Sequence, residues 1–178
     1  MRKHSILLSV LLVLMATTLL AAGSAEAETK VIHFQAISIH CEVVEPPSEE
    51  WVDEKGILHV RDLAILDIVE SDSEYLAGTT IAEVDLDINL ATGNGKAWVT
   101  PTHFPDAFDG TWVAPGQGPI TPAGNMNAHH GYGTGYFEGW TIIYRARKIE
   151  YPGPGDPPCT PLPGDPFTEL TGIIIKGD

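Results

Sequence analysis

The chain has 178 residues, 43% of them hydrophobic, and 24 acidic against 10 basic side chains give a formal net charge of −14 at pH 7. That length suits one domain with its own hydrophobic core. A surface this acidic repels nucleic-acid phosphates and disfavours docking on anionic lipid, so we expect no nucleic-acid partner and no membrane attachment of the mature protein.

The N-terminus has the pattern of a secretory signal peptide. Arg2 and Lys3 precede a continuous apolar run at 5–22, and an A-x-A motif follows it. Basic, apolar and small-residue regions in this order predict a signal peptide at 1–27. The alternative is an uncleaved anchor, since the apolar run is just long enough to span a bilayer. We expect one mature domain at 28–178, secreted or periplasmic.

The chain contains two cysteines, Cys41 and Cys159. In a protein sent to an oxidising compartment, a single disulfide between them is the expected arrangement. It would tie the end of the first predicted strand to a proline-rich segment near the C-terminus. The alternative is a pair of buried free thiols.

Alternation of apolar and polar residues with a period of two dominates the mature chain, and no helical stripe of useful length is present. The stretches 30–44 and 57–71 predict the first two strands, with an acidic, proline-containing loop at 45–56 between them. The stretch 77–101 predicts a hairpin, because its glycine-rich turn at 91–97 supplies residues that accept positive φ.

The C-terminal half continues this pattern. The stretches 108–115 and 131–149 predict two more strands with a loop at 116–125 between them, and 167–177 predicts the last. Seven prolines make 151–166 an extended loop. We expect an all-β protein without substantial helix, as an antiparallel eight-stranded closed barrel, with a β-sandwich as the alternative. Long strands favour the barrel, because closure removes exposed edges.

Gly131, Gly133 and Gly135 stand at every second position. A dinucleotide-binding fingerprint needs G-x-G-x-x-G between a strand and a helix, and neither condition is met. Glycines at this spacing remove side chains from one face of a strand. They indicate a tightly coiled strand, or an aromatic ring packed on bare backbone.

Three short motifs occupy the C-terminal half. Asp109–Trp112 reads D-G-T-W, Gly133–Gly139 reads G-T-G-Y-F-E-G, and Thr171 and Gly172 form a T-G pair in the last predicted strand. With these motifs the C-terminal half resembles the allene oxide cyclase-like barrels, which include plant dirigent proteins and many bacterial secreted domains of unknown function. The resemblance implies an eight-stranded barrel with an apolar cavity, often a homo-oligomer. Plant members are cyclases or guide radical coupling, but none of their catalytic motifs is present, and the proline-rich insertion at 151–166 departs from the pattern.

Glu138 is the candidate catalytic residue. If 131–149 is one strand, Glu138 shares a face with Tyr136 and Trp140. Inside a barrel, desolvation would favour the protonated carboxyl and make it a usable general acid or base. The alternative is a glutamate that pairs with an arginine or meets solvent.

Aromatic residues cluster in the middle and C-terminal strands. Most must fill the core, and some are candidates to line a pocket for a small apolar or aromatic molecule. The pocket candidates are Trp98, Trp112, Tyr136, Trp140 and Tyr144.

No metal or cofactor is expected. His129 and His130 are adjacent, so on a strand they point to opposite faces, and no H-E-x-x-H, H-x-H or C-x-x-C spacing occurs. The acidic residues of 85–89 lack the glycine and glutamate of a calcium loop. A metal site would need one of these histidines brought by the fold to another. The other histidines of the mature chain are His33, His40, His59 and His103.

These observations predict a secreted or periplasmic barrel that is not an enzyme. We expect it to bind a small apolar ligand or to serve as an interaction module of the cell envelope. The first alternative is a cofactor-independent isomerase or cyclase that uses a buried carboxylate. The second is a structural or assembly subunit that meets another chain through a strand edge or its acidic surface.

Overall fold

The computed structural model describes residues 29–150, 156–163 and 167–177, so the predicted signal peptide at 1–27 lies outside the described residues. These residues form ten strands and no helix, and hence none long and apolar enough to cross a membrane. The strands are β1 (Val31–Glu45), β2 (Glu49–Val52), β3 (Ile57–Ser71), β4 (Gly78–Asn89), β5 (Gly95–Pro105), β6 (Gly110–Val113), β7 (Gly116–Thr121), β8 (Gly124–Gly135), β9 (Thr141–Lys148) and β10 (Phe167–Ile175).

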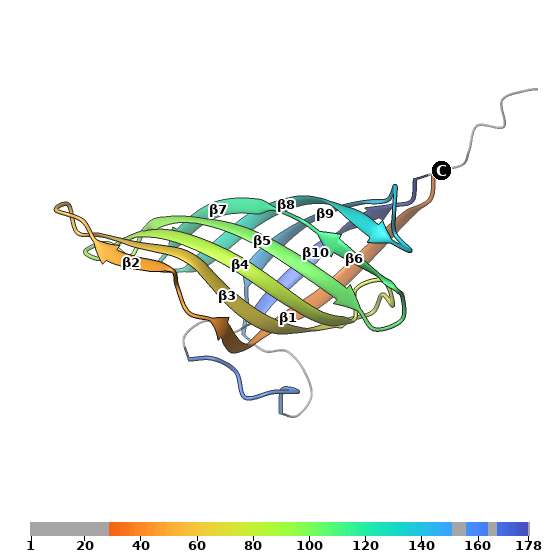
Figure 1. Cartoon of the computed structure of the whole chain (residues 1–178), viewed down its shortest axis with the longest axis horizontal. Helices are drawn as coiled ribbons and strands as arrows, with labels where there is room; N and C mark the ends of the chain where they lie inside the picture. The colour runs from red at the N-terminus through yellow and green to blue at the C-terminus, as the bar shows by residue number, and fades with distance from the viewer. Residues whose placement is uncertain (1–28, 151–155, 164–166, 178) are drawn as a thin grey trace, which may run out of the picture.

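The strands close into an antiparallel barrel (Figure 1). The order runs β1, β10, β9, β8, β6, β5, β4 and β3, and β3 pairs with β1 to complete the ring. β7 also pairs with β5 and β8, so β6 and β7 share one of the eight positions. β2 pairs with β3 outside the ring. The predicted eight-stranded closed barrel is confirmed.

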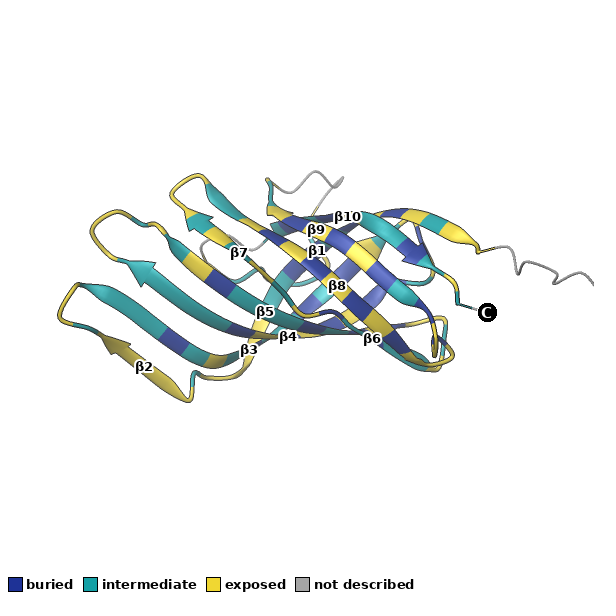
Figure 2. Cartoon of the chain, turned by 90° about the horizontal axis from the view of Figure 1, so that it is seen from above, coloured by how far each residue is buried: buried dark blue, intermediate teal, exposed yellow. Residues whose placement is uncertain are grey.

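Alternation of side chains decides which residues face the interior. Along β4, Thr80, Ala82 and Val84 are buried, while the intervening Ile81 and Glu83 are exposed. A strand that is apolar on one face and polar on the other buries only the first against a core. Figure 2 shows this alternation on the ring strands, with the buried residues most frequent away from the β2 end.

Two segments expected to be loops contain strands. Within 45–56, β2 pairs with β3 as the outer arm of a hairpin. Within 116–125, β7 pairs with both β5 and β8, and β8 begins at Gly124. Glycine and proline lowered the strand propensity of the second segment. Pairing on both sides supplies backbone hydrogen bonds that propensity does not record.

The segment 131–149, expected to be one strand, is a hairpin. β8 ends at Gly135, which has a φ of 59° that only glycine adopts readily, and β9 begins at Thr141. In the turn, Phe137 folds back over Gly133, where an added Cβ would lie 2.3 Å from the Cβ of Phe137. The absence of a side chain at Gly133 therefore makes room for the Cβ atom and the main chain of Phe137.

Aromatic residues close one end of the barrel. The rings of Trp112 and Phe137 stack with centroids 4.5 Å apart, and both side chains are fully buried. Trp140 packs on both, and Tyr75 packs on Phe137 from the loop before β4. Trp112 lies on β6, and the other three residues come from the loops and turns at the same end of the strands, so the four form a plug there. We call this set the aromatic end.

The disulfide Cys41–Cys159 is present, with Cα atoms 5.9 Å apart, and it confirms the predicted pairing. It fastens the described part of the proline-rich loop, 156–163, beside the C-terminal end of β1 (Figure 1). The backbone N–H of Leu162 also donates to the carbonyl oxygen of His40 at 2.9 Å. The loop is thereby held at the end of the barrel opposite the aromatic end.

Candidate functional site

The barrel encloses a cavity of about 220 Å³ between the aromatic end and the opposite end. Inward side chains of β1, β3, β4, β5, β8, β9 and β10 line it. The deepest lining residues, Thr80 and His103, are fully buried, whereas the side chain of His40 is 26% exposed. Among the described residues, the cavity therefore opens at the end away from the aromatic plug.

One wall of the cavity is apolar. It consists of short or β-branched side chains on β3, β4 and β5, which face inward by the alternation described above. Small residues here leave space that larger ones would fill. The wall includes Ile65, Ala82, Val84, Val99 and Pro101.

The polar part of the lining lies on β1, β8, β9 and β10, and also on β3, β4 and β5 at positions nearer the aromatic end than the apolar wall. Strand register sets part of this polar arrangement. His40 of β1 lies directly across from Asp67 of β3, Asp67 from Thr80 of β4, and Thr80 from His103 of β5. Directly opposite residues are the closest neighbours between strands. The register thus puts four polar side chains in one continuous row across four strands.

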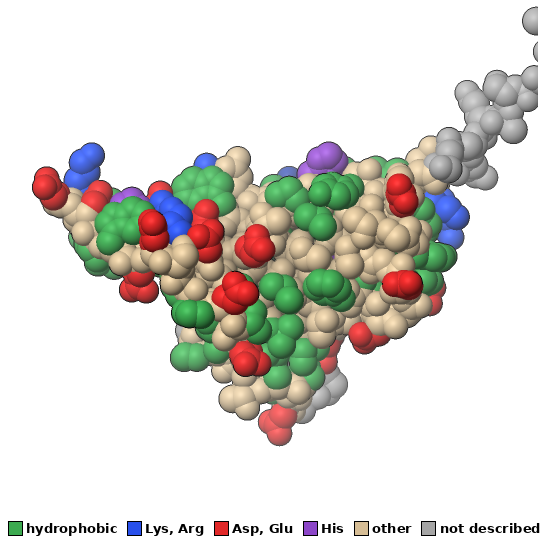
Figure 3. Space-filling view, in the orientation of Figure 1, with side chains coloured by type: hydrophobic (Ala, Val, Ile, Leu, Met, Phe, Trp, Pro, Cys, Tyr) green, Lys and Arg blue, Asp and Glu red, His purple; other side chains and the backbone are tan. Residues whose placement is uncertain are grey.

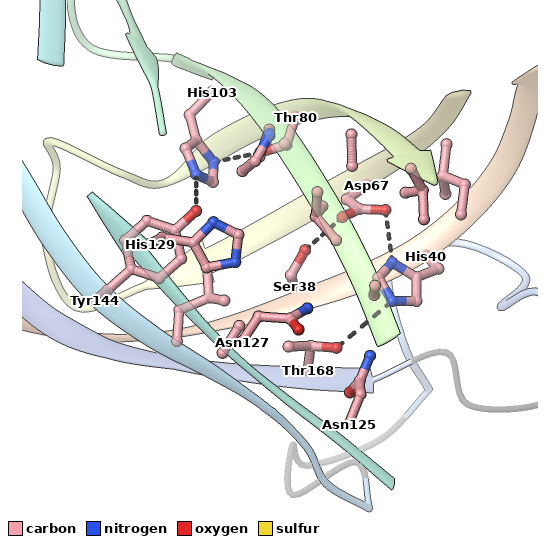
Figure 4. A pocket seen from close by; sticks show the side chains of 18 of the residues that line it. Ser38, His40, Asp67, Thr80, His103, Asn125, Asn127, His129, Tyr144 and Thr168 are labelled. Atoms are coloured by element: carbon pink, nitrogen blue, oxygen red, sulfur yellow. Dashed lines mark hydrogen bonds and ion pairs between the residues drawn. The ribbon is translucent and has the colours of Figure 1, made fainter. Parts of the chain in front are cut away.

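Asp67 is the one carboxylate that the described residues contribute to the cavity lining, and it is 4% exposed. The hydroxyl of Ser38 donates to its Oδ2 at 2.8 Å, and His40 Nδ1 lies 2.7 Å from its Oδ1 (Figure 4). A buried carboxylate is costly unless it is paired and hydrogen-bonded. These two partners supply that compensation.

Asp67 in turn controls the charge of His40. Burial by itself lowers the pKa of His40, but the hydrogen bond and the negative charge of Asp67 outweigh it, so the pKa is raised above its ordinary value of 6.5. The other ring nitrogen, Nε2, lies 3.5 Å from the hydroxyl of Thr168. The raised pKa extends the range of pH in which His40 is protonated and forms an ion pair with Asp67 beside the mouth of the cavity.

A second polar chain occupies the deep part of the cavity. His103 Nδ1 lies 2.5 Å from the hydroxyl of Thr80, and His103 Nε2 lies 3.1 Å from the hydroxyl of Tyr144 (Figure 4). Burial lowers the pKa of His103 to about 4, despite the opposing charge of Asp67. Burial also raises the pKa of Tyr144, and the same charge adds to that effect. Both groups are neutral at pH 7.

His129 presents a free acceptor. Its Nδ1 lies 2.7 Å from the carbonyl oxygen of Ala114, so Nδ1 carries the proton and donates it. Burial lowers the pKa of His129, so the ring is neutral and Nε2 holds a lone pair. The ring stacks on Tyr144 with centroids 4.5 Å apart. No described residue donates a hydrogen bond to Nε2.

Asn127 lies two residues before His129 on the same inward face of β8. It is 5% exposed, and its Oδ1 has no hydrogen-bond partner among the described residues. Glycines of β7 make room for both side chains: a Cβ on Gly118 would lie 2.6 Å from Asn127 Oδ1, and one on Gly116 would lie 2.4 Å from His129 Nδ1. An unpaired buried polar atom beside a cavity points to a bound molecule or water.

The aromatic pocket candidates have different positions in the structure. Tyr144 lines the cavity. Trp112 and Trp140 belong to the aromatic end. Tyr136 is 53% exposed, and Trp98 faces outward on β5. Of the five candidates, only Tyr144 is part of the cavity.

Glu138 is not in the cavity. It lies in the turn between β8 and β9 and is exposed. The catalytic hypothesis for it required a strand across 131–149 with this face inward, and the turn that starts at Tyr136 ends the alternation on which that hypothesis depended. The cavity carboxylate is Asp67 instead.

The fold brings three of the histidines to the cavity, namely His40, His103 and His129. His103 has both ring nitrogens in hydrogen bonds, and His129 has one. Within the described ranges, no group of three or more His, Cys, Asp or Glu side chains is arranged to hold a metal ion.

Sequence reasoning missed Asp67, Ser38, Thr80 and Asn127. Asp67 left the clearest signal, since it is an acidic residue at an inward position of the apolar run in β3. A charged residue among buried apolar ones is unusual and indicates a partner or a function. Thr80 and Ser38 carry no such signal.

The fold and the cavity define a class: a closed antiparallel barrel plugged at one end, with an internal site lined by both apolar and polar side chains. No family model matches the chain, and no match was found among the curated proteins or the solved structures. The resemblance to the allene oxide cyclase-like barrels therefore stays a prediction.

Proposed function

We propose that the protein is a secreted or periplasmic binding protein that holds a small, largely apolar molecule inside its barrel. The observation that carries this proposal is the cavity of about 220 Å³ with an apolar wall facing polar groups. Ligand sites have this character, with hydrophobic surface for affinity and a few polar groups for orientation. A purely structural barrel would be expected to fill its interior.

The size of the cavity limits the ligand. A cavity of about 150 Å³ in an engineered protein is enough to hold benzene. At about 220 Å³, this cavity fits one substituted six-membered ring or an aliphatic molecule of similar volume. Small inward side chains such as Ala82 and Ala97 keep this space open.

Export is supported by two independent features. The N-terminal sequence has the three regions of a signal peptide. The disulfide Cys41–Cys159 is the kind of bond that persists in oxidising compartments. Both features fit a protein that meets its ligand outside the cytoplasm.

Native mass spectrometry of disulfide-intact protein, isolated from its own source, tests the binding proposal. We expect a co-purifying small molecule with the unmodified protein. Ala82→Trp fills the cavity from β4 and should remove the adduct. Ala128→Trp makes the same change on the outward face of β8, where Ala128 is exposed, and should retain it. Both variants are first checked for cooperative unfolding.

Bare protein mass in all three samples, together with no binding of one-ring compounds added at millimolar concentration, would refute the proposal. An adduct that persists in a folded Ala82→Trp variant would place the ligand outside the cavity and refute it as well.

A second candidate function is proton transfer on a bound molecule, as in a cofactor-independent isomerase. The observation that favours it is the Asp67–His40 pair, 2.7 Å apart and within the cavity lining. A hydrogen-bonded carboxylate and imidazole can move a proton to or from a bound carbon acid. The test is deuterium incorporation into the co-purified molecule in D₂O. Asp67→Asn should abolish it, and incorporation that is equal in both proteins would exclude this function.

A further inference from the structure

The charges and hydrogen-bonding groups of the cavity restrict the chemical class of ligand that it can bind. Among the described residues, the lining contains no Lys or Arg side chain and one carboxylate, that of Asp67. The only histidine of the lining with a raised proton affinity, His40, already pairs with that carboxylate. A carboxylate or phosphate ligand would therefore find no cation among these lining residues except His40, whose charge is already paired with Asp67.

Several hydrogen-bond acceptors of the cavity are unused. Asp67 uses one acceptor site on each carboxylate oxygen, for Ser38 and for His40, and each oxygen can accept a second bond. Asn127 Oδ1 has no partner among the described residues, and His129 Nε2 holds an unused lone pair. A ligand that donates hydrogen bonds would satisfy these atoms, and one that only accepts would not.

The electrostatic field around the protein also favours a ligand that carries a positive charge. The formal net charge is −14, and Figure 3 shows Asp and Glu side chains spread over the face in view, with few Lys or Arg. Such a surface raises the local concentration of cations and lowers that of anions.

From these three observations, and resting on the proposed binding function, we infer that the ligand of this cavity is a small organic amine. Its ammonium group donates to Asp67 and neighbouring acceptors, and its hydrocarbon part lies on the wall formed by β3, β4 and β5. Because an ammonium has three N–H donors and no acceptor, it complements the unused acceptors of Asp67, Asn127 and His129. A charge-assisted bond to Asp67 is the strongest contact available to it.

Three compounds of nearly equal size test the inference: 2-phenylethylamine, 2-phenylethanol and 3-phenylpropionate. They share one ring and a short chain, and at pH 7.5 they differ in charge. Isothermal titration of the disulfide-intact protein in 150 mM NaCl measures each Kd. We expect the amine to bind at least about 10-fold tighter than the alcohol, and the acid at least about 10-fold weaker than the alcohol.

Asp67→Asn identifies the group responsible, since it keeps the size of the side chain and removes the charge. In this variant the amine and the alcohol should bind within about 3-fold of each other. Asp106→Asn is the matched control: Asp106 is exposed beside the aromatic end, and the substitution changes the net charge equally. It should leave the preference for the amine unchanged.

The outcomes separate the two proposals. If no compound binds, the binding function itself fails. If the alcohol binds but the amine binds no tighter, or if the acid binds best, the amine inference is overturned and the binding function stands. An amine preference that Asp106→Asn reduces as much as Asp67→Asn would come from the surface and also overturn the inference. The order of the three Kd values in the unmodified protein tests the amine inference even if Asp67→Asn does not fold.

Discussion

Buried His103 makes the barrel sensitive to acid in a defined range of pH. Its pKa is lowered from 6.5 to about 4 because the ring is fully buried. Between these values the unfolded chain binds a proton that the folded protein does not bind. The free energy of unfolding therefore falls as the pH is lowered from 6.5 to 4, and this contribution is fully retained above pH 6.5.

The size of the effect follows from the shift. Each pKa unit corresponds to about 1.4 kcal/mol, so the full loss below pH 4 is roughly 3 kcal/mol. On going from pH 7.5 to pH 5, His103 alone should lower the free energy of unfolding by about 2 kcal/mol. His129, whose pKa is also lowered by burial, adds a loss of the same sign in the same range.

Urea unfolding of the disulfide-intact protein at a series of pH values measures this effect. His103→Gln keeps groups that can hydrogen-bond to Thr80 and Tyr144 but does not titrate, so it should lose about 2 kcal/mol less than the unmodified protein between pH 7.5 and pH 5. His130→Gln, at an exposed outward position of β8, is the control and should show the original pH dependence. Equal pH dependence in all three proteins would show that the reasoning about His103 is wrong.

Four further outcomes are expected. Replacing Cys41 and Cys159 by Ala should lower the free energy of unfolding, measured by urea unfolding, by roughly 4–5 kcal/mol, because the disulfide closes a loop across 118 residues and limits the entropy of the unfolded chain. An unchanged value would contradict a formed disulfide. Phe137→Ala should cost about 3–5 kcal/mol in the same assay, because it empties the fully buried centre of the aromatic end. Glu138→Gln should change neither stability nor ligand affinity measured by titration calorimetry, since this side chain is exposed. The raised pKa of His40 adds stability that is fully present below pH 6.5 and is lost as the pH rises through that pKa, so His40→Gln should flatten the alkaline side of the urea-unfolding profile.

The fold was largely predictable because it depends on a local feature of the sequence, the alternation of apolar and polar residues. Alternation along stretches such as 77–101 shows directly which residues face inward, and long alternating stretches favour closure. The errors arose where local pattern and strand pairing disagree. The segment 131–149 keeps an apolar pattern through the turn at 136–140, and only the positive φ of Gly135 and the packing of Phe137 on Gly133 reveal the reversal.

Most of the candidate site could not be predicted from the sequence, because it depends on the register between neighbouring strands. The contact of Asp67 with His40 requires β3 to pair with β1 at one register out of several that keep the same faces inward. Tyr144 and His129 meet because β8 and β9 form a hairpin, which the sequence-based prediction merged into one strand. The disulfide was predictable because only two cysteines were available to pair.

The aromatic end has a consequence for how molecules travel. If the barrel binds a ligand as proposed, the buried rings of Trp112 and Phe137 obstruct one end, so the ligand enters and leaves by the mouth beside His40 and the loop held by Cys159. A molecule longer than the cavity must enter head first and leave its tail in solvent. The cavity then recognises only the part of the molecule that it encloses, and the part left in solvent can differ between ligands. Compounds that share one head group would compete for the protein whatever their total length, and the tail of a captured molecule would stay within reach of a second protein.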